Sequence, residues 1–371
     1  MKRNIYQIIS ALFLAGTVIS ISLPFQSCSD DFAGDGIDSV KWTGSILPDD
    51  SMYLNPVFAP DLTAPSVFKG AGGYYAYGNE NEWSNGFVVK VPIVTSKNLM
   101  RWDFYGNAFE WKPVWTDDTI KSVSVSYSGS MKLILMFYNA GNAIGLAYSE
   151  SPLGPFTDFG KILDTDSIAV DNVYDPFFIQ VNYKIKVGVR WILVEKNMLF
   201  FGRKQGIFCV ELSISANAAN QIAKVAIKKG PFKVAGNAFS RIYIAPIDKK
   251  YYLFGTIGQK GSTSIAFGAS DSVQGPYHDK NGNDLVNSEG TVLVANNPSS
   301  QYQSPCNVGG IFADVDGNYW IIYNAFDVQR KLLPSGKERY YLILSPLKFD
   351  DKRWPLPFEV KGGWCYPRVS Q

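Results

Sequence analysis

The stretch DLTAPSVF, residues 61–68, combines residue types that often do chemistry with a turn that would present them. The carboxylate Asp61 and an Ala-Pro pair precede a short apolar run, a glycine hairpin and the aromatic run YYAYG (74–78). Turns of this kind often carry catalytic groups into a cleft. Ala64, however, stands directly before the proline, where a carboxylate would be able to act as an acid or a base. The turn is therefore of a kind that can present a catalytic group, and the residue directly before its proline has no group that could act as an acid or a base.

Residue types that bind metals or act as nucleophiles are sparse. His278 is the only histidine, and it lies in a Gly-Pro-Tyr-His turn, where a surface role is favoured over a ligand role. Beyond Cys28, the cysteines Cys209, Cys306 and Cys365 are far apart and lack CxxC spacing, so a zinc site is not expected. Three buried thiols are favoured over one disulfide and a single thiol.

Composition predicts a folded, strand-rich chain with no bias towards nucleic acids. Of the 371 residues, 46% are hydrophobic, 18% are charged and 15% are aromatic, which favours a sizeable core and β-strands. The segment 1–27 contains Lys2 and Arg3 and no acid, so the remaining chain has 35 − 2 = 33 basic residues against 33 acidic ones. This neutral balance gives no electrostatic support to nucleic-acid binding.

The N-terminus reads as a targeting segment. MKRN supplies positive charge, IYQIISALFLAGTVISISL is apolar, and Cys28 follows a serine and precedes acidic residues. These features resemble a bacterial lipoprotein signal. We expect a signal peptide at 1–27, a flexible tether at 28–41 and a lipid on Cys28. The expected location is the outer membrane or cell surface of a Gram-negative bacterium, with a periplasmic or secreted protein as the alternative.

The rest of the chain, 42–371, is predicted to be a repeat of small sheets. Strand-like runs begin at residues 74, 132, 186, 250 and 318, separated by turn residues. AIGLAYSESPLGPF (143–156) matches SIAFGASDSVQGPY (264–277), and both end in Gly-Pro-aromatic. Strand groups at such intervals are typical of a propeller. We predict an all-β, five-bladed β-propeller in a single domain. A pair of β-sandwiches is the alternative.

Four segments in order carry a family resemblance, which spans nearly the whole chain after residue 41. They are NPVFAPDLTAPSVFKGAGGYYAYG (55–78), VYDPFF (173–178), GGIFADVDGNYWIIYNAF (309–326) and RYYLILSPLKFDDKRWPLP (339–357). Together with the two Gly-Pro-aromatic turns, they are similar to glycoside hydrolase family 43 and its five-bladed-propeller relatives. The resemblance implies inverting hydrolysis of arabinose- or xylose-containing glycans by a monomer. It implies no cofactor and leaves a central ion open.

The same resemblance implies three carboxylates, of which this chain retains one. The general base of the family corresponds to Ala64, and the general acid corresponds to about Ser240. The carboxylate that adjusts the pKa of the acid corresponds to Asp175. No glutamate occurs between Glu211 and Glu289, so a small slip of alignment does not restore the acid. Base and acid together are expected to be absent.

Three hypotheses follow from these residues. The first is a glycan-binding lipoprotein that has lost hydrolysis and binds oligo- or polysaccharides. Its candidate binding residues are aromatic or polar and lie in expected loops or at the last blade: Trp83, Asn81, Glu82, Trp111, Trp115 and Arg339. For Trp83 the alternative is a buried ring, and for Arg339 it is a solvated charge at a strand edge. The second is an active arabinofuranosidase, arabinanase or β-xylosidase in which Asp61 is a relocated base, although a turn cap is the favoured role of Asp61. The third is a scaffold propeller without a glycan.

Overall fold

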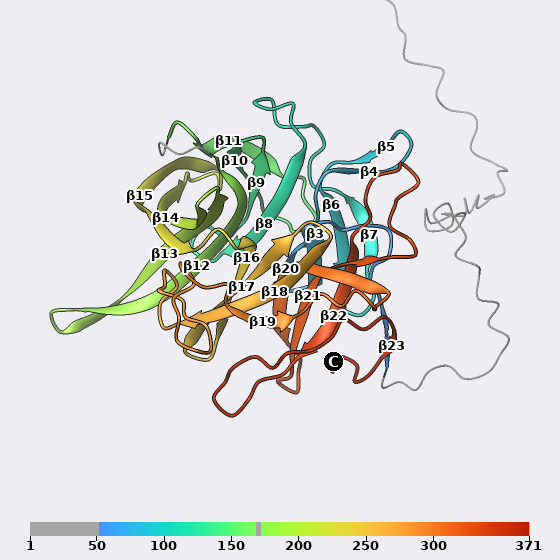
Figure 1. Ribbon diagram of the computed structural model, residues 1–371. Coiled ribbons are helices and arrows are strands. Elements are labelled where there is room, and N and C mark those ends of the chain that lie inside the picture. Colours follow the sequence, from blue (N-terminus) through green and yellow to red (C-terminus); the bar gives the residue numbers. More distant parts are fainter. Residues whose placement is uncertain (1–51, 168–171, 371) are drawn as a thin grey trace, which may run out of the picture. The chain divides into compact units, whose positions relative to one another are not determined.

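The computed structural model describes residues 52–167 and 172–370, and every regular element in these ranges is a β-strand (Figure 1). Residues 46–371 form one compact unit. The predicted signal peptide, the tether and Cys28 lie outside the described residues. In the described ranges, no helix has the length and apolar composition that a membrane span requires.

Five sheets, here called blades 1 to 5, follow one another along the chain. Blade 1 contains β2 (Ser66–Gly70), β3 (Gly73–Tyr77), β6 (Pro92–Ser96) and β7 (Asp103–Asn107). Blade 2 contains β8 (Ile120–Ser128), β9 (Leu133–Ala140), β10 (Ala143–Ser149) and β11 (Thr157–Asp164). Blade 3 contains β12 (Tyr174–Val187), β13 (Arg190–Arg203), β14 (Gly206–Ala216) and β15 (Ile222–Ala235). Blade 4 contains β16 (Ser240–Ile247), β17 (Lys250–Gln259), β18 (Ser262–Ser270) and β19 (Thr291–Val294). Blade 5 contains β20 (Tyr302–Ala313), β21 (Tyr319–Asp327) and β22 (Tyr341–Leu347).

Two further strand pairs lie outside the blades. They are β1 (Tyr53–Asn55) with β23 (Gly363–Cys365), and β4 (Asn81–Ser84) with β5 (Phe87–Val89). Within each blade, sequential strands pair antiparallel, as short turns between strands require. The predicted all-β, five-bladed propeller is confirmed.

Apolar content explains why the blades stack. All eight residues of β9 are buried, because this strand lies in the middle of a blade that is covered on both faces. The innermost strands β2, β8, β12, β16 and β20 are neighbours in a closed ring. Hydrogen bonds join adjacent blades: Val125 N donates to Ser66 Oγ, and Phe178 N donates to Ser124 Oγ, both at 2.9 Å. Serine hydroxyls on inner strands therefore fix the blades against one another.

The beginning of the propeller closes the ring on its last blade. Val57 N donates to Leu342 O at 2.9 Å, and Leu342 N donates to Phe58 O at 3.2 Å. Asn55, whose side chain is buried, donates from Nδ2 to Leu344 O at 2.7 Å and accepts from Leu344 N at 3.0 Å. The segment before blade 1 thus adds to the outer edge of blade 5.

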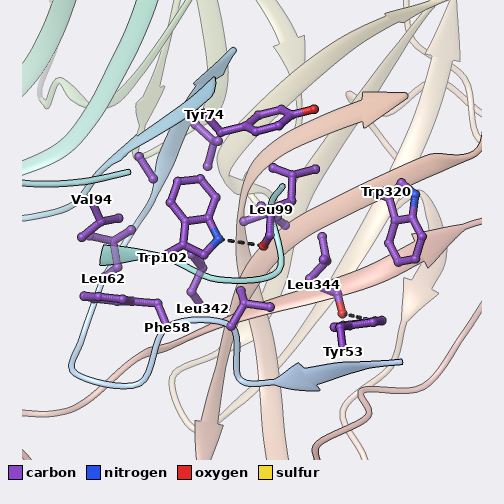
Figure 2. Packing of buried hydrophobic residues seen from close by; sticks show 14 of the residues in the cluster. Tyr53, Phe58, Leu62, Tyr74, Val94, Leu99, Trp102, Trp320, Leu342 and Leu344 are labelled. Carbon is purple, nitrogen blue, oxygen red and sulfur yellow. Dashed lines mark hydrogen bonds between the residues drawn. The ribbon is translucent and has the colours of Figure 1, made fainter. Parts of the chain in front are cut away.

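A core cluster packs over this closure (Figure 2). The ring of Trp320 lies edge-on to Tyr53, with centroids 5.7 Å apart, and Tyr53 donates its hydroxyl hydrogen to Leu344 O at 2.8 Å. Trp102 Nε1 donates to Leu99 O at 2.8 Å, so this indole is buried without losing its hydrogen bond. Apolar packing and satisfied polar groups therefore hold blades 1 and 5 together.

The two matching segments of the sequence, 143–156 and 264–277, form turns with the same hydrogen bonds. In blade 2, Ser151 N donates to Ser149 Oγ at 3.1 Å, and Gly154 N donates to Ser151 O at 3.0 Å. In blade 4, Ser272 makes the same two bonds at the same distances, to Ser270 Oγ and from Gly275 N. Each turn ends in a buried aromatic ring. Cys209, Cys306 and Cys365 are free and buried, as expected.

We predict that Asn55→Ala lowers the free energy of unfolding by about 1–3 kcal/mol, since it leaves the buried Leu344 N without its acceptor and removes one of the two donors to Leu344 O. Urea unfolding of the variant and of wild type measures the difference. Asn281→Ala, at an exposed asparagine, is the matched control and is expected to change stability by less than about 0.5 kcal/mol. Equal effects of the two substitutions would show that closure does not depend on Asn55.

Candidate functional site

In each blade, one residue within the inner strand or just before it has the same unusual backbone conformation. These five residues, here called the axial residues, have positive φ: Ala64 (52°), Ser122 (50°), Asp175 (50°), Arg241 (35°) and Asn307 (52°). All except Ala64 lie where the strand pairing shifts at a β-bulge. Such bulges aim side chains away from the regular pleat and are common beside active sites. The fold thus presents one side chain per blade at equivalent positions.

The axial residues contain a single carboxylate, Asp175. The position that the family resemblance assigns to the base holds the methyl group of Ala64. In blade 4 the axial residue is Arg241, one residue after the expected acid position, Ser240. Ser240 is exposed, and its hydroxyl lies 3.4 Å from Thr256 O. A cation therefore occupies the axial position in the blade where an acid was expected.

The guanidinium of Arg241 bridges three blades. Its Nη2 donates to Ala64 O at 2.6 Å and to Pro65 O at 3.0 Å in the blade 1 turn. The same nitrogen lies 3.3 Å from Val123 O in blade 2. The side chain is 7% exposed, and its Nε and Nη1 have no hydrogen-bond partner among the described residues. Burial lowers the pKa of Arg241 to about 10, while the charge of Asp175 opposes this shift, so the group stays positive at neutral pH.

Asp175 is held on the side of blade 2. Its Oδ1 accepts a short hydrogen bond from Ser122 Oγ, and Ser122 N donates to Asn79 Oδ1 at 2.6 Å. The carboxylate is half-buried and contributes to the electrostatic environment of Arg241. One carboxylate cannot activate a water molecule and protonate a leaving group on the other side of a sugar at the same time.

Amide groups complete the axial arrangement. Asn324 Oδ1 accepts from Ala64 N at 2.9 Å and from Asn307 Nδ2 at 3.2 Å. Asn324 Nδ2 donates to the carbonyl groups of Leu62 and Tyr341, both at 3.1 Å. The turn that carries Ala64 is thus fixed by a fully buried side chain with neutral hydrogen bonds.

The inner strands line an axial cavity of about 280 Å³, and Arg241 belongs to its wall. Other lining residues come from all the remaining blades, among them Pro65, Val123, Phe177 and Val308. Because the guanidinium bonds to the walls formed by blades 1 and 2, it fills space between strands that no shorter axial side chain reaches.

Asp61 has a structural role in this fold. It is 1% exposed, its Oδ1 accepts from Thr63 Oγ1 at 2.9 Å and from Tyr340 N at 2.8 Å, and its Oδ2 accepts from Asn81 Nδ2 at 2.9 Å. Burial raises the pKa of Asp61 above its ordinary value, although the hydrogen bonds lower it again in part. The relocated-base role does not fit, because no solvent water reaches a carboxylate buried in this way.

The expected sugar platform at Trp83 is also corrected. Its ring is 1% exposed and packs against Phe58 and Phe104, with centroids 6.2 and 5.1 Å away, so neither face is open to a ligand. Asn81 is bound to Asp61, and Glu82 Oε1 accepts from Gly86 N at 3.0 Å. These residues stabilise the loop after the first aromatic strand.

Arg339 lies in the last blade near Tyr341. Its Nη1 lies 3.2 Å from Tyr341 Oη, and the guanidinium lies 5.8 Å from the centre of that ring. The side chain is half-buried, and Nε has no hydrogen-bond partner among the described residues. It is therefore neither a fully solvated charge nor directly bound to an axial residue.

The open aromatic surface lies before blade 2. Trp111 is 77% exposed, and Lys90 Nζ lies 5.7 Å from the centre of its ring. Trp115 is half-buried, stacks on Tyr138 and donates to its hydroxyl at 2.9 Å. Of the two tryptophans expected in this loop, Trp111 is therefore the open one.

Beside Trp115 lies a second cavity, of about 480 Å³, with Asp117, Asp118, Asn142 and Asp164 among its lining residues. The sequence analysis missed this cavity, although Asp117 and Asp118 directly follow the tryptophan. It lies at the end of blade 2 where β8 begins, which is also the end that carries Ser122. Among the residues that the structure describes, no three His, Cys, Asp or Glu side chains gather as a metal site.

We predict that Arg241→Met lowers the free energy of unfolding by about 2–3 kcal/mol, because the bonds from a charged donor to the carbonyl groups of blades 1 and 2 are lost. Urea unfolding tests this. Arg101→Met removes an exposed arginine and is expected to change stability by less than about 0.5 kcal/mol. An Arg241 variant as stable as this control would exclude a bridging role.

A pH series tests the burial of Asp61. Because its pKa in the folded chain lies above the ordinary value of 3.8, ionisation removes stability as pH rises from that value through the folded pKa. Asp61→Asn does not ionise, so the free energy of unfolding of wild type minus that of the variant is expected to fall with rising pH. Unfolding in urea from acid to neutral pH measures it. A difference that rises with pH would contradict a buried carboxyl group with a raised pKa.

A comparison with known proteins finds one matching family and several solved structures with a similar fold. The family described as Glycosyl hydrolases family 43 matches residues 53–355. A GH43 endo-arabinanase from Bacillus licheniformis is 20% identical, covers 80% of this chain and 97% of its own, and has a TM-score of 0.58. An α-L-arabinanase from Cellvibrio cellulosa, complexed with arabinohexaose, is 17% identical, with coverages of 80% and 95% and a TM-score of 0.60. An exo-1,5-α-L-arabinanase from a bovine ruminal metagenomic library is 20% identical, with coverages of 84% and 99% and a TM-score of 0.59. The family match spans most of the propeller, and the chain belongs to glycosyl hydrolase family 43.

Proposed function

We propose that this protein binds arabinose- or xylose-containing glycans and does not hydrolyse them. The observation that carries the proposal is the guanidinium of Arg241, which lies among the axial residues and bonds to the turn of Ala64. The family and the arabinanase-like fold support a glycan as the ligand. The replaced axial groups support binding without turnover.

The axial charges are unfavourable for glycoside hydrolysis. The inverting reaction needs a base and an acid, which typically contribute about 10²–10⁴ in rate each. Here the base position is a methyl group, and the blade 4 group is a cation with a pKa of about 10. The transition state resembles an oxocarbenium ion, so its positive charge would be repelled by Arg241. Asp175 is the only axial residue that would stabilise it.

The face of the propeller near Ser122 supplies features that suit sugar rings. Trp111 offers an open aromatic face, and the 480 Å³ cavity beside Trp115 offers carboxylates and an amide as hydrogen-bonding groups. Aromatic faces that bury sugar CH groups, combined with a few polar groups, are the usual composition of such sites. We place the glycan along this surface.

The sequence also supports a lipid anchor at Cys28, which would hold the binding surface at a cell membrane. This part of the proposal depends on the positive, apolar and cysteine pattern of the first residues. Mass spectrometry of the mature N-terminus tests it: a chain that starts at a lipidated Cys28 agrees, and an unmodified cysteine within a longer chain contradicts it.

Binding and hydrolysis are separated by one assay series. Purified protein at high concentration is incubated for long times with arabinan, arabinoxylan and aryl glycosides, and the same polysaccharides are used in affinity electrophoresis. Retarded migration without released sugar is the expected result. Released sugar would overturn the proposal in favour of an active glycosidase, and unretarded migration without product would favour a scaffold propeller.

We predict that Trp111→Ala weakens polysaccharide binding by about 2- to 10-fold, the factor that corresponds to the loss of one aromatic contact. The dissociation constant from affinity electrophoresis measures the effect. Trp191→Ala is the control, because Trp191 is also an exposed tryptophan, 65% exposed, but lies in blade 3. An equal loss in both variants would mean that Trp111 is not a specific contact.

A further inference from the structure

Blade 3 extends into a free two-stranded ribbon. β12 and β13 pair without a break from Phe177–Phe200 to the turn at Val187–Arg190, but β14 pairs with β13 only from Asn197 onwards. The ribbon, here defined as residues 182–193, stands away from the blades (Figure 1). Its described side chains are all exposed. An isolated hairpin is at best marginally stable in water, so this one lacks the covering layer that strands normally have.

Apolar residues occupy both faces of the ribbon. Cross-strand partners in an antiparallel pair share a face, so Trp191 and Leu193 lie on the face of their partners Lys186 and Lys184. Ile192 alternates with them and therefore lies on the opposite face. The exposed fractions are 65% for Trp191, 65% for Leu193 and 46% for Ile192.

The turn adds two more exposed apolar residues. Val189 is 93% exposed, and Val187, which pairs with Arg190, is 53% exposed. Gly188 has a φ of 61°, and the space around its Cα is open. The tip therefore exposes two valines beside a single charged residue, Arg190.

The charge of the ribbon has one sign. Residues 182–193 contain Lys184, Lys186 and Arg190 and no acidic residue, although the chain as a whole is nearly neutral. At the base, Lys196 Nζ lies 5.0 Å from the centre of the Tyr183 ring. Positive charge thus surrounds an apolar tip, and the long basic side chains have room to direct their charged ends away from it.

We infer that the ribbon inserts its tip into the surface of a bilayer that contains anionic lipids. A protein surface or a second copy of this chain would cover one face of the ribbon, whereas a bilayer surrounds the tip and covers both. A second copy would also bring three positive charges against three others. Anionic headgroups complement those charges, and an indole at the level of Trp191 suits the boundary between headgroups and acyl chains.

Vesicle binding tests this inference. The protein is residues 46–371, the compact unit whose ends are joined by β1 and β23, so the apolar N-terminal stretch does not contribute. Co-sedimentation uses vesicles of phosphatidylcholine alone and of phosphatidylcholine with phosphatidylglycerol. Binding to the anionic vesicles only, weakened by salt, is expected. No binding to anionic vesicles would overturn the inference.

Two variants and one control locate the contact. The variant Lys184→Gln/Lys186→Gln/Arg190→Gln is expected to bind anionic vesicles about 100-fold more weakly, since each basic residue near such a surface contributes about fivefold. Val189→Ser/Trp191→Ser removes the apolar tip and is also expected to weaken binding. Trp111→Ser, at an exposed tryptophan in another part of the chain, is expected to bind like wild type. Equal binding by all of these proteins would overturn the inference.

A label on the tip provides a measurement that does not depend on these variants. Val189→Cys is coupled to an environment-sensitive fluorophore. Burial keeps the three native thiols unreactive, because it raises the pKa of Cys209 and Cys306 to about 12 and also raises the pKa of Cys365. A blue shift on anionic vesicles is expected. An unchanged spectrum would overturn the inference. A second result would also overturn it: the wild-type protein does not bind vesicles, forms a dimer in sedimentation equilibrium, and loses this dimer in Val189→Ser/Trp191→Ser.

Discussion

The contact between the Arg241 guanidinium and the backbone carbonyl groups of blades 1 and 2 determines what the axial region of this propeller can do. Three carbonyl oxygens, of Ala64, Pro65 and Val123, converge on one nitrogen of a side chain that is almost fully buried. The backbone carbonyl group of Ala64 is one of these three acceptors. The residue at the expected base position and the arginine of blade 4 are thus joined by a direct hydrogen bond.

The backbone around these groups retains a form suited to a catalytic site. Each blade has a positive-φ residue within its inner strand or just before it, and in four blades a β-bulge accompanies it. Such conformations cost free energy, and non-glycine residues adopt them only where the surroundings impose them. Here the surroundings include two neutral hydrogen bonds that Asn324 Oδ1 accepts, from Ala64 N and from Asn307 Nδ2. The fold therefore presents one axial side chain from each blade, and Asp175 is the only carboxylate among the five.

The architecture was predictable from the sequence because it depends on local sequence patterns that repeat from blade to blade. The two Ser-x-Ser-x-x-Gly-Pro turns form matching hydrogen bonds, and the five strand groups form five blades. The absence of a carboxylate at position 64 was also evident from the sequence, since it depends only on the identity of the residue before Pro65. Arg241 was missed because a bulge displaces the axial residue of blade 4 by one position from the simple count to Ser240, and pairing registers are not visible in a single sequence.

Other features depend on contacts between distant segments. Trp83 is buried by Phe58, which lies before blade 1, and by Phe104, which lies in β7. The burial of Trp83 was therefore not predictable from its loop alone. The bond that Asp61 accepts from Tyr340 N joins residues 279 positions apart, so it was not predictable from the local turn. The neutral total charge hid the local segregation of basic residues in the ribbon, because net charge carries no information on position.

The central claim is that a cation, held by backbone carbonyl groups, has replaced the carboxylate pair of the axial site. The most direct measurement is a crystal structure of the protein after long exposure to arabinohexaose. If this claim holds, the structure will contain an intact oligosaccharide near Trp111, with Arg241 Nη2 still within hydrogen-bond distance of Ala64 O. A cleaved sugar at the axial residues, with Arg241 displaced and a water molecule held by a carboxylate, would contradict it.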